Sequence, residues 1–150
     1  MKTFICDFEA YQLGNAGTYY PLEIALLNCD TKTCEMFYVK YLQNIHDLTT
    51  QFQFKRHGIG WKDGNEFLEQ AFYKMNSLVS YNDIIYVKGL EKTKYIREWF
   101  PLVVVIEILN APSLMEIKTD VSFTCHKHNP KLYLACAKRK AYSLLPYVCV

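Results

Sequence analysis

The sequence predicts a single α/β domain over residues 1–150, with a five-stranded mixed sheet flanked by helices. Three observations support this fold class. Three strand-like apolar segments come first, and helical and strand-like patterns then alternate, an order that indicates a mixed sheet. No repeat, linker or low-complexity tract divides the chain. Hydrophobic residues make up 51% and charged residues 21% of the sequence, which is typical of a globular domain and excludes a disordered or fibrous chain.

The first three predicted strands form an antiparallel meander. The first, Thr3–Phe8, is followed by a glycine-containing loop at residues 14–17. The second, Glu23–Cys29, follows Pro21, and the turn after it returns the chain as the third strand, Cys34–Val39.

The remaining elements alternate between helical and strand periodicity. In chain order we expect a helix around Asp47–Phe54, a helix from Phe67 to Leu78, a strand over Ile84–Val87, a helix over Glu91–Trp99, a strand over Leu102–Ile108, and a last helix over Leu132–Leu145 that ends at Pro146.

Two acidic residues, Asp7 and Glu9, stand at the end of the first apolar strand. Two residues of a strand that have one residue between them point to the same side of the sheet. Two-metal phosphodiester hydrolysis needs about four carboxylates that converge on a pair of divalent cations. The pair could therefore be half of a nuclease site.

The order of the elements resembles the ribonuclease-H-like fold in its DnaQ-like exonuclease form. The DEDDh group of these enzymes continues with a motif similar to His-Asn-x-x-Phe-Asp and ends with His-x-Ala-Leu-x-Asp-Ala. In this chain the third carboxylate position falls on Lys92 or Thr93. The fourth falls on Lys140, and Ala135 stands in place of the base histidine.

A lysine ammonium occupies the space that a divalent cation would need and repels the cation. We therefore expect neither Mg²⁺ nor Mn²⁺ at this centre, and no conventional DEDDh exonuclease activity. The open alternative is an exonuclease that uses Asp7, Glu9 and a displaced acid, for which the candidates are Asp83, Glu91 and Glu107.

Cys125, His128 and Cys136 follow the pattern Cys-x-x-His-x7-Cys. Thiolate and imidazole are the ligands of structural zinc sites, which are closed by four protein groups. His126 could replace His128 if the loop is wound differently. The three residues predict a structural Zn²⁺ site that lacks a fourth ligand.

Two segments resemble motifs of Maelstrom domains. Their Pro-x-Glu-Ile-Ala signature is similar to Tyr20-Pro21-Leu22-Glu23-Ile24-Ala25, and their Thr-His-x-Ile-Pro region is similar to His57-Gly58-Ile59. Those domains share the DnaQ-like fold, lack its full acidic set and hold zinc with a Glu-Cys-His-Cys group. The resemblance implies that Glu23 is the fourth ligand, and that the domain binds single-stranded RNA with at most weak endoribonuclease activity. Glu23 could instead be a buried carboxylate that is bonded to the backbone where the last helix starts.

Basic residues gather in two segments that could bind phosphates, one on the helix after the fourth predicted strand and one around the predicted zinc loop and the last helix. Alternatively, each is an ordinary solvated helix face. The candidates for nucleic-acid binding are Lys88, Lys92, Lys127, Lys131, Lys138, Arg139 and Lys140.

The sequence shows neither a signal peptide nor an apolar run long enough to span a membrane. We therefore expect an intracellular protein, cytoplasmic or nuclear, whose six cysteines are thiols or metal ligands. Besides RNA binding and the exonuclease alternative, a third hypothesis is a catalytically dead nuclease fold that serves as a protein-interaction scaffold.

Overall fold

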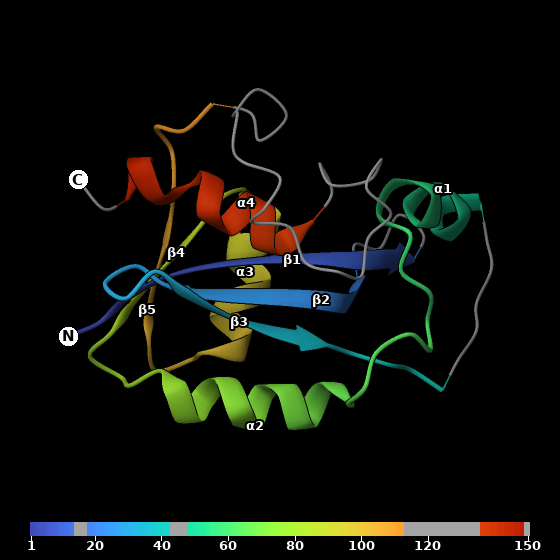
Figure 1. Ribbon diagram of the computed structural model, residues 1–150, viewed down its shortest axis with the longest axis horizontal. Coiled ribbons are helices and arrows are strands. Elements are labelled where there is room, and N and C mark those ends of the chain that lie inside the picture. Colours follow the sequence, from blue (N-terminus) through green and yellow to red (C-terminus); the bar gives the residue numbers. More distant parts are fainter. Residues whose placement is uncertain (14–17, 43–47, 113–135, 149–150) are drawn as a thin grey trace.

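The computed structural model describes residues 1–13, 18–42, 48–112 and 136–148. Its centre is a five-stranded sheet in the order β3-β2-β1-β4-β5 (Figure 1). The strands are β1 (Thr3–Leu13), β2 (Thr18–Asn28), β3 (Thr33–Tyr38), β4 (Ile84–Val87) and β5 (Val104–Glu107). β1, β2 and β3 are antiparallel neighbours, whereas β4 is parallel to β1 and β5 is parallel to β4. The predicted α/β class with a mixed sheet is confirmed.

Helices cover both faces of this sheet (Figure 1). The described helices are α1 (Leu48–His57), α2 (Leu68–Leu78), α3 (Leu90–Trp99), α4 (Ala137–Ser143) and the 3-10 turn η4 (Leu145–Tyr147). α2 and α3 pack on one face through a core that includes Met75 and Ile96. α4 packs on the other face through Ala137 and Ala141. None of the described helices is long and apolar enough to cross a membrane.

β1 supplies buried side chains to both layers because successive residues of a strand point to opposite faces. Phe4, Cys6 and Phe8 belong to the core under α2 and α3. Ile5 belongs to the core under α4. The alternation places Asp7 and Glu9 on the α4 side as well, beside this apolar core. The position of the acid pair therefore follows from the pleat of β1.

Most element boundaries differ from the predictions by a few residues. β4 is confirmed at Ile84–Val87. β1 runs five residues beyond Phe8, because it pairs with β2 as far as Leu13. α1 ends at His57, beyond the predicted Phe54. α4 begins at Ala137, with Cys136 as the residue before the helix, and the predicted start at Leu132 lies outside the described residues.

Candidate functional site

Asp7 and Glu9 lie where β1 extends beyond its parallel neighbour. The last pair of that ladder joins Ile5 to Tyr86, and β4 ends one residue later at Val87. Asp7 is fully buried, and Glu9 is 6% exposed. Two carboxylates removed from water need compensating charge or hydrogen bonds. The source of that compensation defines the site.

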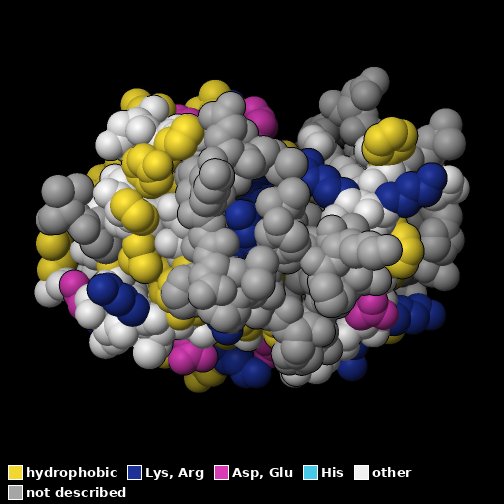
Figure 2. Space-filling model, turned by 45° about the horizontal axis from the view of Figure 1, so that its top comes forward, with side chains coloured by type: hydrophobic (Ala, Val, Ile, Leu, Met, Phe, Trp, Pro, Cys, Tyr) yellow, Lys and Arg dark blue, Asp and Glu magenta, His cyan; other side chains and the backbone are white. Residues whose placement is uncertain are grey.

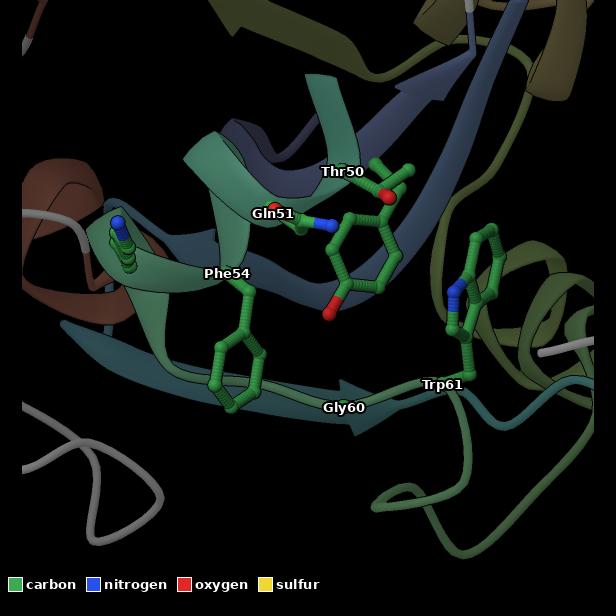
Figure 3. A pocket seen from close by; sticks show the side chains of 7 residues that line it. Thr50, Gln51, Phe54, Gly60 and Trp61 are labelled. Atoms are coloured by element: carbon green, nitrogen blue, oxygen red, sulfur yellow. The ribbon is translucent and has the colours of Figure 1, made fainter. Parts of the chain in front are cut away.

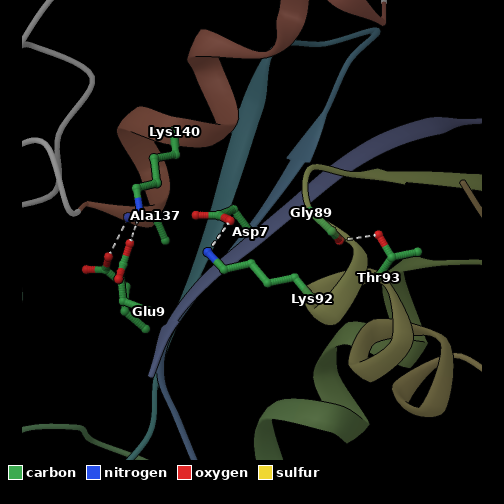
Figure 4. A network of polar contacts seen from close by, with 8 residues as sticks. Asp7, Glu9, Gly89, Lys92, Thr93, Ala137 and Lys140 are labelled. Atoms are coloured by element: carbon green, nitrogen blue, oxygen red, sulfur yellow. Dashed lines mark hydrogen bonds and ion pairs between the residues drawn. The ribbon is translucent and has the colours of Figure 1, made fainter. Parts of the chain in front are cut away.

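Lys92 compensates Asp7, with its Nζ 2.7 Å from Oδ1 of the aspartate (Figure 4). Gly89 turns the chain into α3 with a φ of 101°, in the region that favours glycine. The hydroxyl of Thr93 donates to the carbonyl oxygen of Gly89 at 2.7 Å. Of the two residues at the third carboxylate position, Lys92 is therefore the one that contacts the acid pair.

The ammonium of Lys92 remains protonated in this setting. Burial by itself lowers the pKa of Lys92, but the carboxylates of Asp7 and Glu9 outweigh burial, so the pKa is raised above its ordinary value. Nζ also lies 5.2 Å from the centre of the Phe8 ring, where a cation is attracted to the face of the ring. The second oxygen of Asp7, Oδ2, has no hydrogen-bond partner among the described residues.

Lys140 compensates Glu9 from the opposite layer. Its Nζ pairs with Oε1 of Glu9, and both side chains are almost completely buried (Figure 4). The small side chains of Ala137 and Ala141, both fully buried, are the parts of α4 that pack on the sheet. Small residues at these positions allow the helix to come close to β1. Lys140 therefore reaches the acid pair directly.

Glu23 stands opposite Glu9 in the antiparallel ladder, beside a β-bulge between Glu9 and Ala10. Two like charges directly opposite each other destabilise a sheet. α4 compensates both carboxylates. The N–H of Ala137 donates to Oε1 of Glu23 at 2.7 Å, and the ammonium of Lys140 pairs with Glu9. The first turn of one helix thus binds two buried glutamates.

Of the four predicted zinc ligands, the structure brings Glu23 and Cys136 together. Cys136 is fully buried and directly precedes Ala137, whose N–H binds Glu23. Cys125 and His128, with the alternative His126, lie outside the described residues. The backbone bond to Glu23 was the open alternative to zinc ligation. This hydrogen bond from Ala137 to Glu23 is also compatible with zinc ligation by Glu23, since carboxylates that bind a metal are themselves hydrogen-bonded.

A thiol and a carboxylate at adjacent positions fit the donor set of a structural zinc site. Within the part of the chain that the structure describes, no group of three His, Cys, Asp or Glu side chains could hold a metal ion. Burial is the main cause that raises the pKa of Cys34 to about 12, and it raises the pKa of Cys6 well above its ordinary value, so both remain neutral.

The other cationic residues have varied surroundings. Nζ of Lys88 donates to the carbonyl oxygen of Ala111 at 3.0 Å. Arg139 is 3% exposed, and Lys138 beside it is half-buried. Lys127 and Lys131 lie outside the described residues. The structure thus gathers Lys92 and Lys140 at the acid pair and places Lys88 on a backbone carbonyl.

A cavity of about 170 Å³ opens beside these ion pairs, between β1, α1 and α3. We call it the cationic pocket, and its polar lining includes Glu9, Gln53, Arg56, His57, Lys92 and Lys140. The amide oxygen of Gln53 accepts the backbone N–H of Gln12 at 2.8 Å and so ties α1 to β1. The N–H of Ile59 donates to Nδ1 of His57 at 3.0 Å and orients the buried ring. Arg56 is exposed.

The charges around this pocket leave a positive excess. Among the described residues that line the pocket, Arg56, Lys92 and Lys140 are cationic and Glu9 is the one carboxylate. Asp7, the ion-pair partner of Lys92, does not line it. Arg56 was missed as a site residue by sequence reasoning. The run Lys55-Arg56-His57 at the end of α1 was the available signal. Figure 2 shows dark-blue Lys and Arg side chains recessed near the middle of this face.

None of the three displaced acids lies with the acid pair. Asp83 precedes β4 at the other end of the sheet, where its carboxylate accepts the N–H groups of Lys2 at 2.7 Å and Ser80 at 2.8 Å. Burial by itself would raise the pKa of Asp83, but these two hydrogen bonds hold it below its ordinary value. Glu91 is exposed beside Lys94. Glu107 ends β5, which is separated from β1 by β4.

No model of a known protein family matches this chain, and no curated protein sequence matches it either.

Proposed function

We propose that this chain is a ribonuclease-H-like domain that binds single-stranded RNA and does not carry out two-metal hydrolysis. The observation that carries the proposal is the pair of buried ion pairs, Lys92 with Asp7 and Lys140 with Glu9. The order β3-β2-β1-β4-β5, with three antiparallel strands followed by two parallel ones, is compatible with that fold.

The two lysines argue against hydrolysis on electrostatic grounds. An ammonium 2.7 Å from Asp7 holds the position at which a divalent cation would bind that oxygen. A second cation in the same place would be repelled by several kcal/mol at short range in a partly buried site. Any weak endoribonuclease activity, which the resemblance to Maelstrom domains implies, would have to use residues other than this pair.

The cationic pocket supports phosphate binding in place of metal binding. Arg56 has no ion-pair partner among the described residues, and it lies close enough to Lys92 for its charge to oppose the rise in that pKa. A guanidinium forms two parallel hydrogen bonds to phosphate, and phosphate contacts provide the sequence-independent part of nucleic-acid affinity. The preference for RNA over DNA follows from the resemblance.

Substitution of Arg56 by alanine should weaken binding of a labelled single-stranded oligoribonucleotide about tenfold at low salt. Loss of one phosphate contact should also reduce the slope of log K against log salt concentration by about 0.7 for a single strand. Fluorescence anisotropy over a salt series, with EDTA present throughout, measures both quantities. The same titrations with duplex RNA and single-stranded DNA test the class of nucleic acid.

The matched control is Lys94→Ala, which removes an exposed cation from α3 near Lys92. It should leave both the affinity and the salt slope close to those of the wild type. Equal effects of the two substitutions would show that the cationic pocket is not the phosphate site. Binding of the oligoribonucleotide only when Mg²⁺ is added would contradict the proposed function.

Structural zinc is the second part of the proposal. Glu23 and Cys136 would supply two ligands, and Cys125 and His128 the other two. The ion would join the start of α4 to β2, the same junction that the Ala137–Glu23 hydrogen bond already makes. Four protein ligands leave no open position for water, so the ion would stabilise the fold without catalysing a reaction. An intracellular, reducing location would keep these thiols available.

Protein purified without chelator should contain about one zinc ion per chain, and the Cys136→Ser and Cys125→Ser variants should each lose it. Inductively coupled plasma mass spectrometry measures the metal content. The control is Cys29→Ser, because Cys29 lies in the core under α4 and directly follows the end of β2, whereas Glu23 lies in the middle of that strand. Zinc-free wild-type protein, or full zinc content in Cys136→Ser, would overturn this part of the proposal.

The scaffold hypothesis is favoured by one observation. Leu102, Val104 and Leu109, on and around the edge strand β5, are more than half exposed. Figure 2 shows hydrophobic side chains gathered at the end of the molecule where Figure 1 places β5. However, the guanidinium of Arg97 caps the carbonyl oxygen of Val105 at 3.1 and 3.2 Å, which protects this edge from pairing with another strand. We therefore rank this second candidate below RNA binding.

A further inference from the structure

A second cavity, which we call the aromatic pocket, lies against the other flank of α1 (Figure 3). Its volume is about 240 Å³, and it is lined by Tyr11, Thr50, Gln51, Phe54, Lys55, Gly60 and Trp61. None of these residues takes part in the acid pair, its lysines or the predicted zinc site. The pocket is therefore a separate feature that the proposed function does not yet use.

The walls of this pocket are aromatic and held in place. The ring centres of Tyr11 and Trp61 are 4.5 Å apart, and each side chain is 3% exposed. Trp61 also packs edge-on against Tyr20 and Tyr41, with ring centres 5.5 and 5.6 Å away. The hydroxyl of Tyr11 donates to the carbonyl oxygen of Ile59 at 2.5 Å. Burial raises the pKa of Tyr11 to about 12, so this wall is uncharged.

Phe54 differs from these buried rings because it is 47% exposed while it lines the cavity. Figure 3 shows Phe54 and Trp61 on opposite sides of the pocket, with Thr50 and Gln51 of α1 along another side. A flat ring placed against Phe54 in this pocket would cover apolar surface on Phe54 that is now in contact with water. The amide of Gln51 offers a donor and an acceptor to the edge of such a ring.

The size and lining of the cavity favour one nucleobase as its ligand. Pockets for drug-sized molecules are roughly 300–1,000 Å³ in volume, so 240 Å³ suits a smaller flat group. Aromatic walls stack any base through its π-face, whatever its sequence. Lys55 adds a positive charge for a phosphate attached to that base.

The two pockets share α1 and β1. Gln53, Arg56 and His57 line the cationic pocket, whereas Gln51, Phe54 and Lys55 line the aromatic pocket. On β1, Tyr11 lines one pocket and Gln12, the next residue, lines the other. A helix is about 10–12 Å across with its side chains. The two pockets therefore lie close enough for neighbouring nucleotides of one strand to enter both.

We propose that the aromatic pocket binds one unpaired base of a single strand whose phosphates lie in the cationic pocket. This inference rests on the proposed function, because it assigns a base site to the same bound strand. Stacking gives affinity that depends little on salt, whereas phosphate contacts give affinity that falls steeply with salt. The two sites are thus separable by experiment.

The first test compares Phe54→Ala with Phe52→Ala in anisotropy titrations with a labelled oligoadenylate. Phe52 lies on the same helix, is 80% exposed and does not line the pocket. We expect Phe54→Ala to weaken binding about tenfold with an unchanged salt slope, and Phe52→Ala to have little effect. Circular dichroism of both variants checks that α1 remains folded.

The second test does not depend on RNA binding. Adenosine monophosphate is titrated into the ¹⁵N-labelled protein, and the two tryptophan indole N–H signals are followed by NMR, with Trp99→Phe used for assignment. The Trp61 signal should shift and the Trp99 signal should not, since Trp99 lies in the core with Phe8 and Phe72. The shift should disappear in Phe54→Ala and persist in Phe52→Ala.

The outcomes separate this inference from the proposed function. If the oligoadenylate does not bind but the Trp61 signal responds to adenosine monophosphate, the base site stands and the RNA-binding proposal fails. If the oligoadenylate binds in an Arg56-dependent manner, while Phe54→Ala matches Phe52→Ala and the Trp61 signal is static, RNA binding stands and the base site is overturned.

Discussion

Replacement of Lys140 by methionine should lower the free energy of unfolding by about 3–5 kcal/mol, because it leaves a buried charge without its partner. Glu9 would lose its ion pair with the Lys140 ammonium while it remains opposite Glu23 in the ladder. Two buried glutamates would then face each other without this compensating charge. Methionine has nearly the length of lysine, which limits the loss of packing. Urea unfolding followed by circular dichroism measures the change.

Two further variants test the electrostatic cause. Lys138→Met removes a half-buried lysine from the same turn of α4 and should change stability by less than about 0.5 kcal/mol. The double variant Glu9→Gln with Lys140→Met should recover much of the lost stability, because no uncompensated charge remains at Glu9. If the double variant is as unstable as Lys140→Met alone, lost packing and not the charge of Glu9 is the cause.

Conversion of both lysines to aspartate should create a divalent-cation site. In the double variant Lys92→Asp with Lys140→Asp, four carboxylates face the position now held by two ammonium groups. The variant should be destabilised without metal, since like charges at one site repel. Mn²⁺ at about one hundred times its Kd should then raise the unfolding free energy by about 2.7 kcal/mol. Wild-type stability should not respond to Mn²⁺.

Thermal unfolding over a Mn²⁺ series measures this response, and electron paramagnetic resonance counts the bound ions. The control Lys92→Asp with Lys138→Asp changes the net charge equally but leaves Lys140 on Glu9. It should show a much smaller Mn²⁺ effect. A Mn²⁺-dependent rise in the wild type equal to that of the double variant would show that the lysines do not exclude the cation.

Local pattern was sufficient to predict most of the fold. Ile84–Val87 was predicted at its observed bounds, and α2 and α3 differ from their predictions by one residue at their starts. These elements are bounded by nearby turn residues and have apolar residues at regular spacing. The length of β1 could not be predicted, because residues beyond Phe8 are in the strand only through pairing with β2. The start of α4 at Ala137 likewise depends on a distant strand, since the N–H of Ala137 binds Glu23 of β2.

Part of the candidate site could likewise be predicted from the sequence, and part of it required the tertiary structure. The Asp7–Glu9 pair was visible in the sequence because strand pleat alone puts both on one side. Arg56 was not selected, since a basic residue at a helix end is ordinary until another element faces it. Tyr11 and Trp61 were two among many aromatic residues, and only the fold makes them walls of one cavity.

The sequence by itself determined which elements form, that two acids lie on one side of the first strand, and that no acid stands where the resemblance to DnaQ-like exonucleases would place two further carboxylates. Only the tertiary structure decided what replaces those acids. Lys92 lies 85 residues from Asp7, Lys140 lies 131 residues from Glu9, and Ala137 lies 114 residues from Glu23. Periodicity in a sequence reports which face of an element is buried. The partner of a buried charge is set by how closely two layers pack, which depends on every element between them.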